Sequence, residues 1–142
     1  MDGSQRSDAT GWQLLTGPEF RKWHEGLTGT AAESVSLALE GLIASGPAPR
    51  STLVKPIKSS RHRDEMHELR SVGGNRRVLF AKTGERRGVL LLGGDKTDQW
   101  NRWYEANVPL GDGIFDRFQH TKGGSSQWRA LNRGSRSATL GR

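Results

Sequence analysis

Three strand-like segments in the middle of the chain restrict its possible folds more than any other feature. They span residues 66–72, 76–83 and 87–93, and they are separated by Gly73–Gly74–Asn75 and Gly84–Glu85–Arg86. Three-residue connections that contain glycine are typical of β-hairpins, so this region predicts an antiparallel meander. The third segment holds an unbroken apolar run at 89–92, which predicts a central strand buried on both faces.

Helical patterns precede the meander. Pro18 is suited to the first position of a helix, and Thr30 with Glu33 forms a capping box in front of a second, strongly periodic helix. A strand is expected at 12–15, and another at 53–57, where a proline restricts it to an edge of the sheet.

After the meander we expect a helix at 98–107, a break at Val108 and Pro109, and a last helix that ends near Phe118. The complete order predicts an α+β fold. We expect a twisted antiparallel sheet with an N-terminal helical hairpin packed on one face.

The two ends of the chain differ in composition from the middle. Residues 1–11 and 121–142 are poor in apolar side chains and rich in Gly and Ser, so we expect both to be disordered and the folded domain to span 12–120. Truncation after Lys122 should then leave thermal stability nearly unchanged. The sequence contains no cysteine, no signal peptide and no membrane-length apolar run, which predicts a cytoplasmic protein.

The charge is strongly basic and unevenly distributed. The net charge is +7 for the whole chain, with +7 carried by 47–96, +5 by 121–142 and −2 by 12–46. Such a balance favours an anionic partner, either nucleic acid or an acidic protein.

Several basic residues should meet at one end of the sheet. Counting outward from the two turns brings Arg70, Arg76, Arg77 and the segment 93–96 to within roughly 10 Å of one another. This register pairs Arg70 with Val78 and, without a bulge, puts Arg77 on the opposite face from Arg70 and Arg76. Cations beside aromatic residues can hold phosphates and stack an unpaired base. The alternative interpretation is a solvated basic rim, with nearby aromatic residues in the core.

Several motifs occur together in an order that resembles one family. They are Met66-x-Glu68-Leu69-Arg70, Arg77-x-Leu79-Phe80, Leu90-Leu91-Leu92-Gly93-Gly94-Asp95-Lys96, Arg102-Trp103-Tyr104-Glu105 and Val108-Pro109-Leu110. Together they resemble the RelE/HigB-type toxins of type II toxin–antitoxin systems, in the RelE/ParE superfamily, and are closest to the phage-derived and actinobacterial branch. The similarity extends over about 12–116.

The resemblance implies a RelE-like microbial RNase fold and a toxin that cleaves mRNA, commonly in the ribosomal A site, and so inhibits translation. Such an mRNA interferase is a metal-independent endoribonuclease without a cofactor. By position, Arg70, Arg77 and Lys96 match the basic catalytic residues of the family. The RNA-binding residues are then expected to be Lys55, Lys58, Arg61, Arg76, Trp103 and Tyr104.

These residue types suit RNA cleavage by attack of the 2′-OH on the adjacent phosphate. Arginine stays protonated, so Arg70 and Arg77 would clamp the phosphate and not act as a base. Lys96 could clamp the phosphate as well, or protonate the leaving oxygen. The general base stays open among Asp95, Glu68, Tyr104 and the ribosome.

Other functions compatible with the sequence are a ParE-like toxin that acts on DNA gyrase without a nuclease site, a decayed toxin that retains antitoxin and operator binding, and a general nucleic-acid-binding module. In the family a C-terminal helix usually continues after Asp112, whereas here Gly111 and Gly113 weaken that helix and the chain after Phe118 looks unrelated to the family. This altered C-terminus favours the decayed toxin. The expected partners are a cognate antitoxin, with a helix-turn-helix, the mRNA with the ribosome, and operator DNA through the antitoxin.

Overall fold

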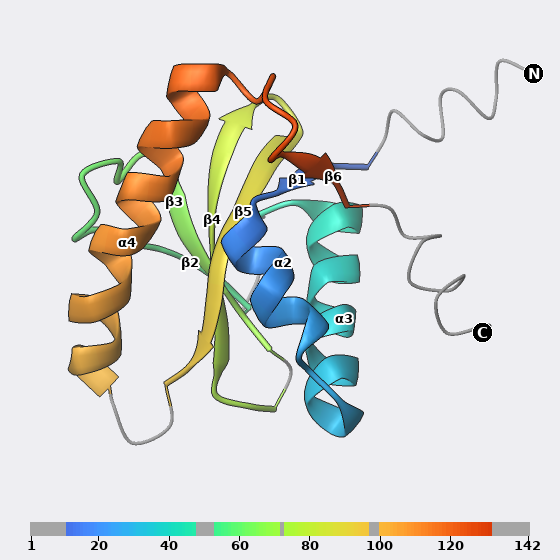
Figure 1. Cartoon of the computed structure of the whole chain (residues 1–142). Coiled ribbons are helices and arrows are strands. Elements are labelled where there is room, and N and C mark those ends of the chain that lie inside the picture. The colour runs from blue at the N-terminus through green and yellow to red at the C-terminus, as the bar shows by residue number, and fades with distance from the viewer. Residues whose placement is uncertain (1–10, 48–52, 72, 97–99, 132–142) are drawn as a thin grey trace, which may run out of the picture.

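A computed structural model describes residues 11–47, 53–71, 73–96 and 100–131. This part of the chain forms an α+β fold with a six-stranded mixed sheet and three helices (Figure 1). In chain order, the elements are β1 (Gln13–Thr16), α2 (Pro18–Glu25), α3 (Gly29–Ser45), β2 (Val54–Pro56), β3 (Met66–Arg70), β4 (Arg76–Gly84), β5 (Arg87–Asp95), α4 (Trp100–Thr121) and β6 (Arg129–Ala130).

The strand order in the sheet is β2-β3-β4-β5-β1-β6. The predicted meander is confirmed as β3, β4 and β5, which pair antiparallel. The expectation of a wholly antiparallel sheet is wrong, because β1 pairs parallel with β5, with Leu15 opposite Val89. A four-residue strand separated from its partner by two helices and three strands carries no turn signal that would specify its direction.

The register between β3 and β4 differs by one residue from the predicted one. Arg70 lies opposite Arg77, not opposite Val78. The amide of Ser71 donates to the carbonyl of Arg76, so the connection has four residues and not three. Since opposed residues of an antiparallel pair share a face, Arg70 and Arg77 lie on the same side of the sheet.

Both faces of the sheet are covered (Figure 1). The first apolar cluster joins α2 and α3 to the sheet through residues such as Phe20, Val35 and Leu90. The second joins α4 to the sheet through Leu91 and Phe115. The prediction that the third meander strand is central and buried on both faces is therefore confirmed. Across the described residues, no helix combines the length and apolarity that a membrane span requires.

One continuous helix, α4, replaces the two helices expected around Pro109. Pro109 is exposed in the middle of this helix, where it removes a backbone donor at a cost of about 3 kcal/mol. Val108, Ile114 and Phe115 are each at most 5% exposed against the sheet. Burial of such side chains contributes about 2 kcal/mol apiece, which outweighs the proline penalty.

The expectation that the chain is disordered from residue 121 onward is wrong for the described part of that segment. Trp128 is 6% exposed, stacks edge-on against Phe118, and lies under the guanidinium of Arg117. Strand β6 follows and pairs with β1. A buried aromatic side chain and a short strand pairing thus fix a segment whose average composition is polar. The expected disorder of 1–10 and 132–142 lies outside the described residues.

The loop between β2 and β3 is fastened to α4. Asp112 is 3% exposed and accepts hydrogen bonds from the hydroxyl of Ser60 and, at 3.1 Å, from the amide of Arg61. The side chains of Arg61 and His62 both contact Asp116 at 2.7 Å, one turn further along the helix. These contacts fasten the loop to the second half of α4.

Trp128→Ala should lower the free energy of unfolding by about 3 kcal/mol, because it removes a buried indole and releases β6. Denaturant unfolding measures this loss. Leu37→Ala, at a position that is 57% exposed, is the control and should have a much smaller effect. Unchanged stability of the Trp128 variant would mean that the C-terminal segment does not contribute to the fold.

Asp112→Ala should cost about 2–4 kcal/mol of unfolding free energy, because it leaves the buried Ser60 hydroxyl and a loop amide without their acceptor. The matched control is Asp116→Ala, whose ion pair with Arg61 is exposed and screened by water, so its loss should destabilise the fold much less. Equal losses in the two variants, measured by urea unfolding, would contradict the assignment of Asp112 as the anchor of the loop.

Candidate active site at the end of the sheet

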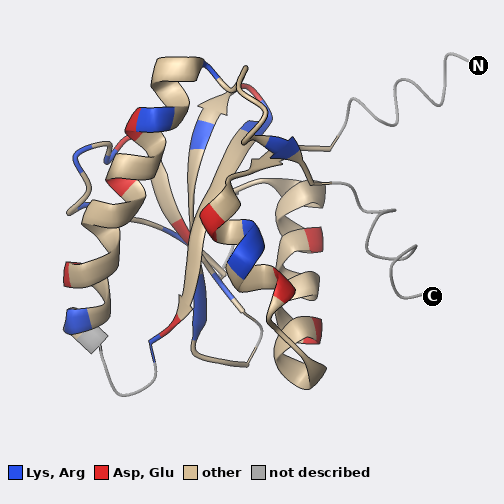
Figure 2. Ribbon diagram, viewed as in Figure 1, with Lys and Arg blue, Asp and Glu red and all other residues tan. Residues whose placement is uncertain are grey.

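Charged side chains gather where β3 and β5 end and β4 begins, beside the first turns of α4. Figure 2 shows Lys, Arg, Asp and Glu at this lower end of the sheet. Glu68, Arg70 and Arg77 share the α4 face of the sheet, because Arg70 opposes Arg77 and Glu68 opposes Leu79 of the α4 core. Lys96 directly follows β5.

The carboxylate of Glu68 lies at the centre of this group. Glu68 is only 3% exposed. Its Oε1 accepts a hydrogen bond of 2.7 Å from the hydroxyl of Tyr104, and its Oε2 lies 3.3 Å from a guanidinium nitrogen of Arg70. A buried carboxylate requires such partners, because removal from water disfavours its charge. The pair also fixes the position of the Tyr104 ring.

Arg77 is 7% exposed and is held in place by the chain around it. One terminal nitrogen donates to the carbonyls of Gly74 and Arg76 at 3.3 and 3.1 Å. Its Nε lies 3.6 Å from Oε1 of Glu68, which is close enough for charge attraction but too long for a hydrogen bond. Among the described residues, this buried Nε therefore has no hydrogen-bond acceptor.

Lys96 completes the cationic group. It is 4% exposed, and its Nζ lies 5.2 Å from the centroid of the Tyr104 ring, a cation–π contact. Burial is the largest cause that lowers the pKa of Lys96, and the positive charge of Arg77 lowers it further. A lysine in this state gives up its proton more readily than one in water.

Tyr104 has the opposite tendency. Burial raises the pKa of its phenol, and the hydrogen bond to Glu68 raises it further. The hydroxyl is therefore protonated at neutral pH and donates to Glu68. This state makes Tyr104 unsuited to act as a base on its own.

The glycines at the end of β5 allow close approach of two tryptophans. A Cβ on Gly93 would lie 2.2 Å from the ring of Trp23, and one on Gly94 would lie 2.6 Å from Nε1 of Trp103. Trp103 is 4% exposed and belongs to the core between α4 and the sheet. Gly93 thus admits Trp23 of α2 on one face, and Gly94 lets α4 approach on the other closely enough for Tyr104 to reach Glu68.

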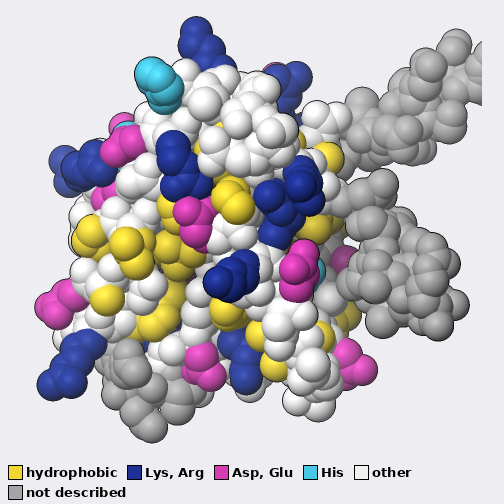
Figure 3. Space-filling model, in the orientation of Figure 1, with side chains coloured by type: hydrophobic (Ala, Val, Ile, Leu, Met, Phe, Trp, Pro, Cys, Tyr) yellow, Lys and Arg dark blue, Asp and Glu magenta, His cyan; other side chains and the backbone are white. Residues whose placement is uncertain are grey.

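The other residues expected to bind RNA are distributed around this cluster. Lys55 is exposed and lies opposite Glu68 on β2, and Lys58 is exposed in the following loop. Arg61 pairs with Asp116 along α4. Arg76 lies 3.8 Å from Asp95 on the other face of the sheet. The face in Figure 3 has Lys and Arg scattered among acidic side chains.

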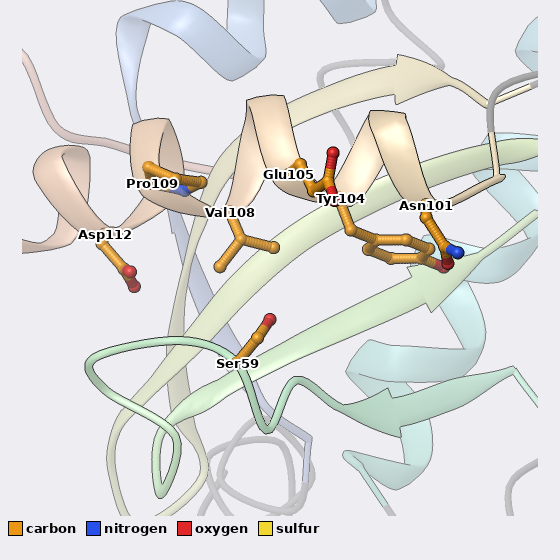
Figure 4. Close-up of a pocket in the computed structure, with 7 residues that line it drawn as sticks. All are labelled: Ser59, Asn101, Tyr104, Glu105, Val108, Pro109 and Asp112. Atoms are coloured by element: carbon orange, nitrogen blue, oxygen red, sulfur yellow. The ribbon is translucent and has the colours of Figure 1, made fainter.

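Beside Tyr104 lies a groove between α4 and the loop after β2, with a volume of about 310 Å³. In Figure 4, Tyr104, Val108 and Asp112 extend from α4 toward the loop that carries Ser59. The remaining lining residues are Asn101, Glu105 and Pro109. Sequence patterns did not identify this groove, because it depends on the anchoring of the loop by Asp112.

No family model matches the chain. Two curated relatives come from Mycobacterium tuberculosis (strain ATCC 25618 / H37Rv). The chain is 38% identical over 95 residues to the protein named "Putative toxin HigB3", with 67% of this chain and 82% of that protein covered. It is 33% identical over 122 residues to "Putative toxin HigB2", where the alignment covers 81% of this chain but 60% of the relative. At this identity and coverage, the chain belongs to the HigB/RelE-type toxins of toxin–antitoxin systems.

Proposed function

We propose that the protein is the toxin of a type II toxin–antitoxin system and acts as a metal-independent endoribonuclease on mRNA. The observation that carries this proposal is the meeting of Arg70, Arg77 and Lys96 with Tyr104 around Glu68. The proposal includes a RelE-like microbial RNase fold in which α2 and α3 form the N-terminal helical hairpin.

Arg70 and Arg77 bind the scissile phosphate in this proposal. The side chain of Arg70 is 37% exposed and can turn toward a ligand, whereas Arg77 is fixed by two backbone carbonyls. The Nε of Arg77 lacks an acceptor among the described residues, and a phosphate oxygen would supply one. Guanidinium groups match phosphate geometry and neutralise the charge that develops in the transition state.

The reaction requires a proton to leave the 2′-OH and another to reach the 5′ oxygen. The 2′ oxygen attacks phosphorus, the bond to the 5′ oxygen breaks, and a 2′,3′-cyclic phosphate and a 5′-OH result. Lys96 donates the proton to the leaving oxygen, because its lowered pKa makes it a stronger acid than an ordinary lysine. Tyr104 passes the proton of the 2′-OH to Glu68, to which it already donates. Asp95 pairs with Arg76 on the opposite face, which favours Glu68 over Asp95 as the base.

The partners follow from the same proposal. A toxin of this family has an antitoxin, for which we propose a helix-turn-helix protein that also links the toxin to operator DNA. The substrate is mRNA on the ribosome in the cytoplasm. A ParE-like toxin that acts on gyrase would require no cluster of this kind. Primer extension on cellular mRNA after induction distinguishes the two activities, because only a nuclease produces cut transcripts.

Arg70→Gln and Lys96→Gln should each abolish growth arrest on induction, because each removes a cation from the proposed transition-state site while keeping a similar shape. A loss of about 100-fold or more in cleavage is expected. Growth curves and primer extension measure the effect, and thermal unfolding verifies the fold. Arg77→Ala is a poorer test, because it would leave buried Glu68 short of a cation and cost about 3–5 kcal/mol.

The matched control is Arg87→Gln, which removes an exposed cation at the start of β5, the opposite end of that strand. It should remain toxic. Full toxicity of both site variants with an intact fold would refute the nuclease assignment.

Cleavage should decline as pH rises toward the lowered pKa of Lys96, because the proton donor is lost there. The decline should begin below the value of 10.5 that is usual for lysine. Single-turnover cleavage of ribosome-bound mRNA between about pH 7 and about pH 10 measures it. Lys96→Arg cannot titrate in this range, so its slower cleavage should lack the decline. The same alkaline decline in both proteins would exclude Lys96 as its source.

A further inference from the structure

The groove next to Tyr104 has features that the proposed chemistry does not use. One wall is formed by the Tyr104 ring, Val108 and Pro109, which are apolar, and the loop residue Ser59 lies opposite (Figure 4). Apolar and aromatic walls with a few polar groups at the edge are typical of small-ligand sites. A flat heteroaromatic ring with polar edges is the ligand chemistry that such walls favour.

The polar side chains that line the groove differ in whether they already form hydrogen bonds within the protein. Both carboxylate oxygens of Asp112 are used by the loop, through Ser60 and the amide of Arg61. Within the described part of the chain, the side chains of Ser59, Asn101 and Glu105 have no hydrogen bonds to other residues. These three groups can therefore bond to a ligand without breaking an existing contact.

The charges of the cationic cluster and of the groove suit different parts of a nucleotide. The cluster on one side of Tyr104 is cationic, whereas the groove contains Glu105 and Asp112 and no basic lining residue among those described. A phosphate would be repelled from the groove and attracted to the cluster. The ring of Tyr104 borders the groove, and its hydroxyl bonds to Glu68 of the cluster, so the two sites adjoin at one side chain.

We propose that this groove binds the base of a nucleotide adjacent to the scissile phosphate, and that Glu105 makes it prefer guanine. This inference rests on the proposed nuclease function and names a specificity site for it. The carboxylate of Glu105 can only accept hydrogen bonds. Guanine presents two neighbouring N–H donors on its Watson–Crick edge, adenine and cytosine present one amino group there, and uracil presents a single N–H between two carbonyls that repel a carboxylate.

The test compares the cut sites of four proteins in cells, namely the unchanged protein and three variants. mRNA 5′ ends are mapped after induction of the unchanged protein, Glu105→Gln and Glu33→Gln. Glu33 is an exposed glutamate on α3, so its substitution removes the same charge away from the groove. Asn101→Ala is a second groove variant, and because Asn101 and Glu105 are both exposed, neither substitution should disturb folding.

The unchanged protein and Glu33→Gln should cut with guanine enriched at one position beside the cut. Glu105→Gln should reduce this preference by about five-fold or more, the usual effect of losing a paired base contact. Asn101→Ala should alter the preference at the same position. Identical base frequencies around the cut in all four proteins would overturn the groove proposal while leaving the nuclease function intact. An absence of cut mRNA for the unchanged protein would instead refute the nuclease function, and the groove proposal with it.

Discussion

The buried carboxylate of Glu68 is the interaction on which the candidate site depends. An ionised group that is 3% exposed is costly unless cations and donors surround it. These partners come from separate elements: Arg70 from the same strand, Arg77 from β4 and Tyr104 from α4. The site therefore exists only when α4 lies on the sheet, which links the chemistry to the packing of the last helix.

That packing explains several features remote from the charges. Gly94 admits Trp103, so the first turns of α4 approach β5 closely. Asp112 fixes the loop after β2 to the middle of the helix. Trp128, which stacks on Phe118 and lies under Arg117, fixes its end, and Arg117 in turn bonds to Glu19 at 2.9 Å. Three contacts along one helix hold Tyr104 in its place.

The sequence was sufficient to predict the elements whose signals are local. Glycine-containing turns predicted β3, β4 and β5, and the apolar periodicity around Val35 predicted α3. The capping box expected at Thr30 and Glu33 is wrong, because α3 already begins at Gly29 and its N-cap, Thr28, makes no side-chain capping bond. The gathering of Arg70, Arg77 and Lys96 at one sheet end was also predictable, because it requires only the order of the strands. The common face of Arg70 and Arg77 was not predictable in the same way. A connection of four residues instead of three changes the face on which Arg77 lies relative to Arg70.

The remaining differences arise where tertiary burial overrides local preference. Pro109 predicts a helix end, but buried residues on both sides of it keep α4 continuous. The polar composition after residue 121 predicts disorder, but the buried Trp128 and the pairing of β6 with β1 fix the described part of this segment to the domain. Neither outcome can be read from a short window, because each depends on the partner surface that the rest of the chain provides.

In the proposed nuclease, the arrangement separates the part of the substrate common to every RNA from the part that varies. The cationic cluster can contact a phosphate, which is the same at each position of the chain, whereas the groove beside it can contact a base. Tyr104 belongs to both, through its hydroxyl and its ring. Substitution at the exposed rim of the groove can therefore alter base preference without moving Arg77 or Lys96, which are held by β4 and by burial beneath α4. Because the groove and the cluster are separate, base preference can change by substitution in the groove while the buried charges of Glu68, Arg77 and Lys96 keep their positions.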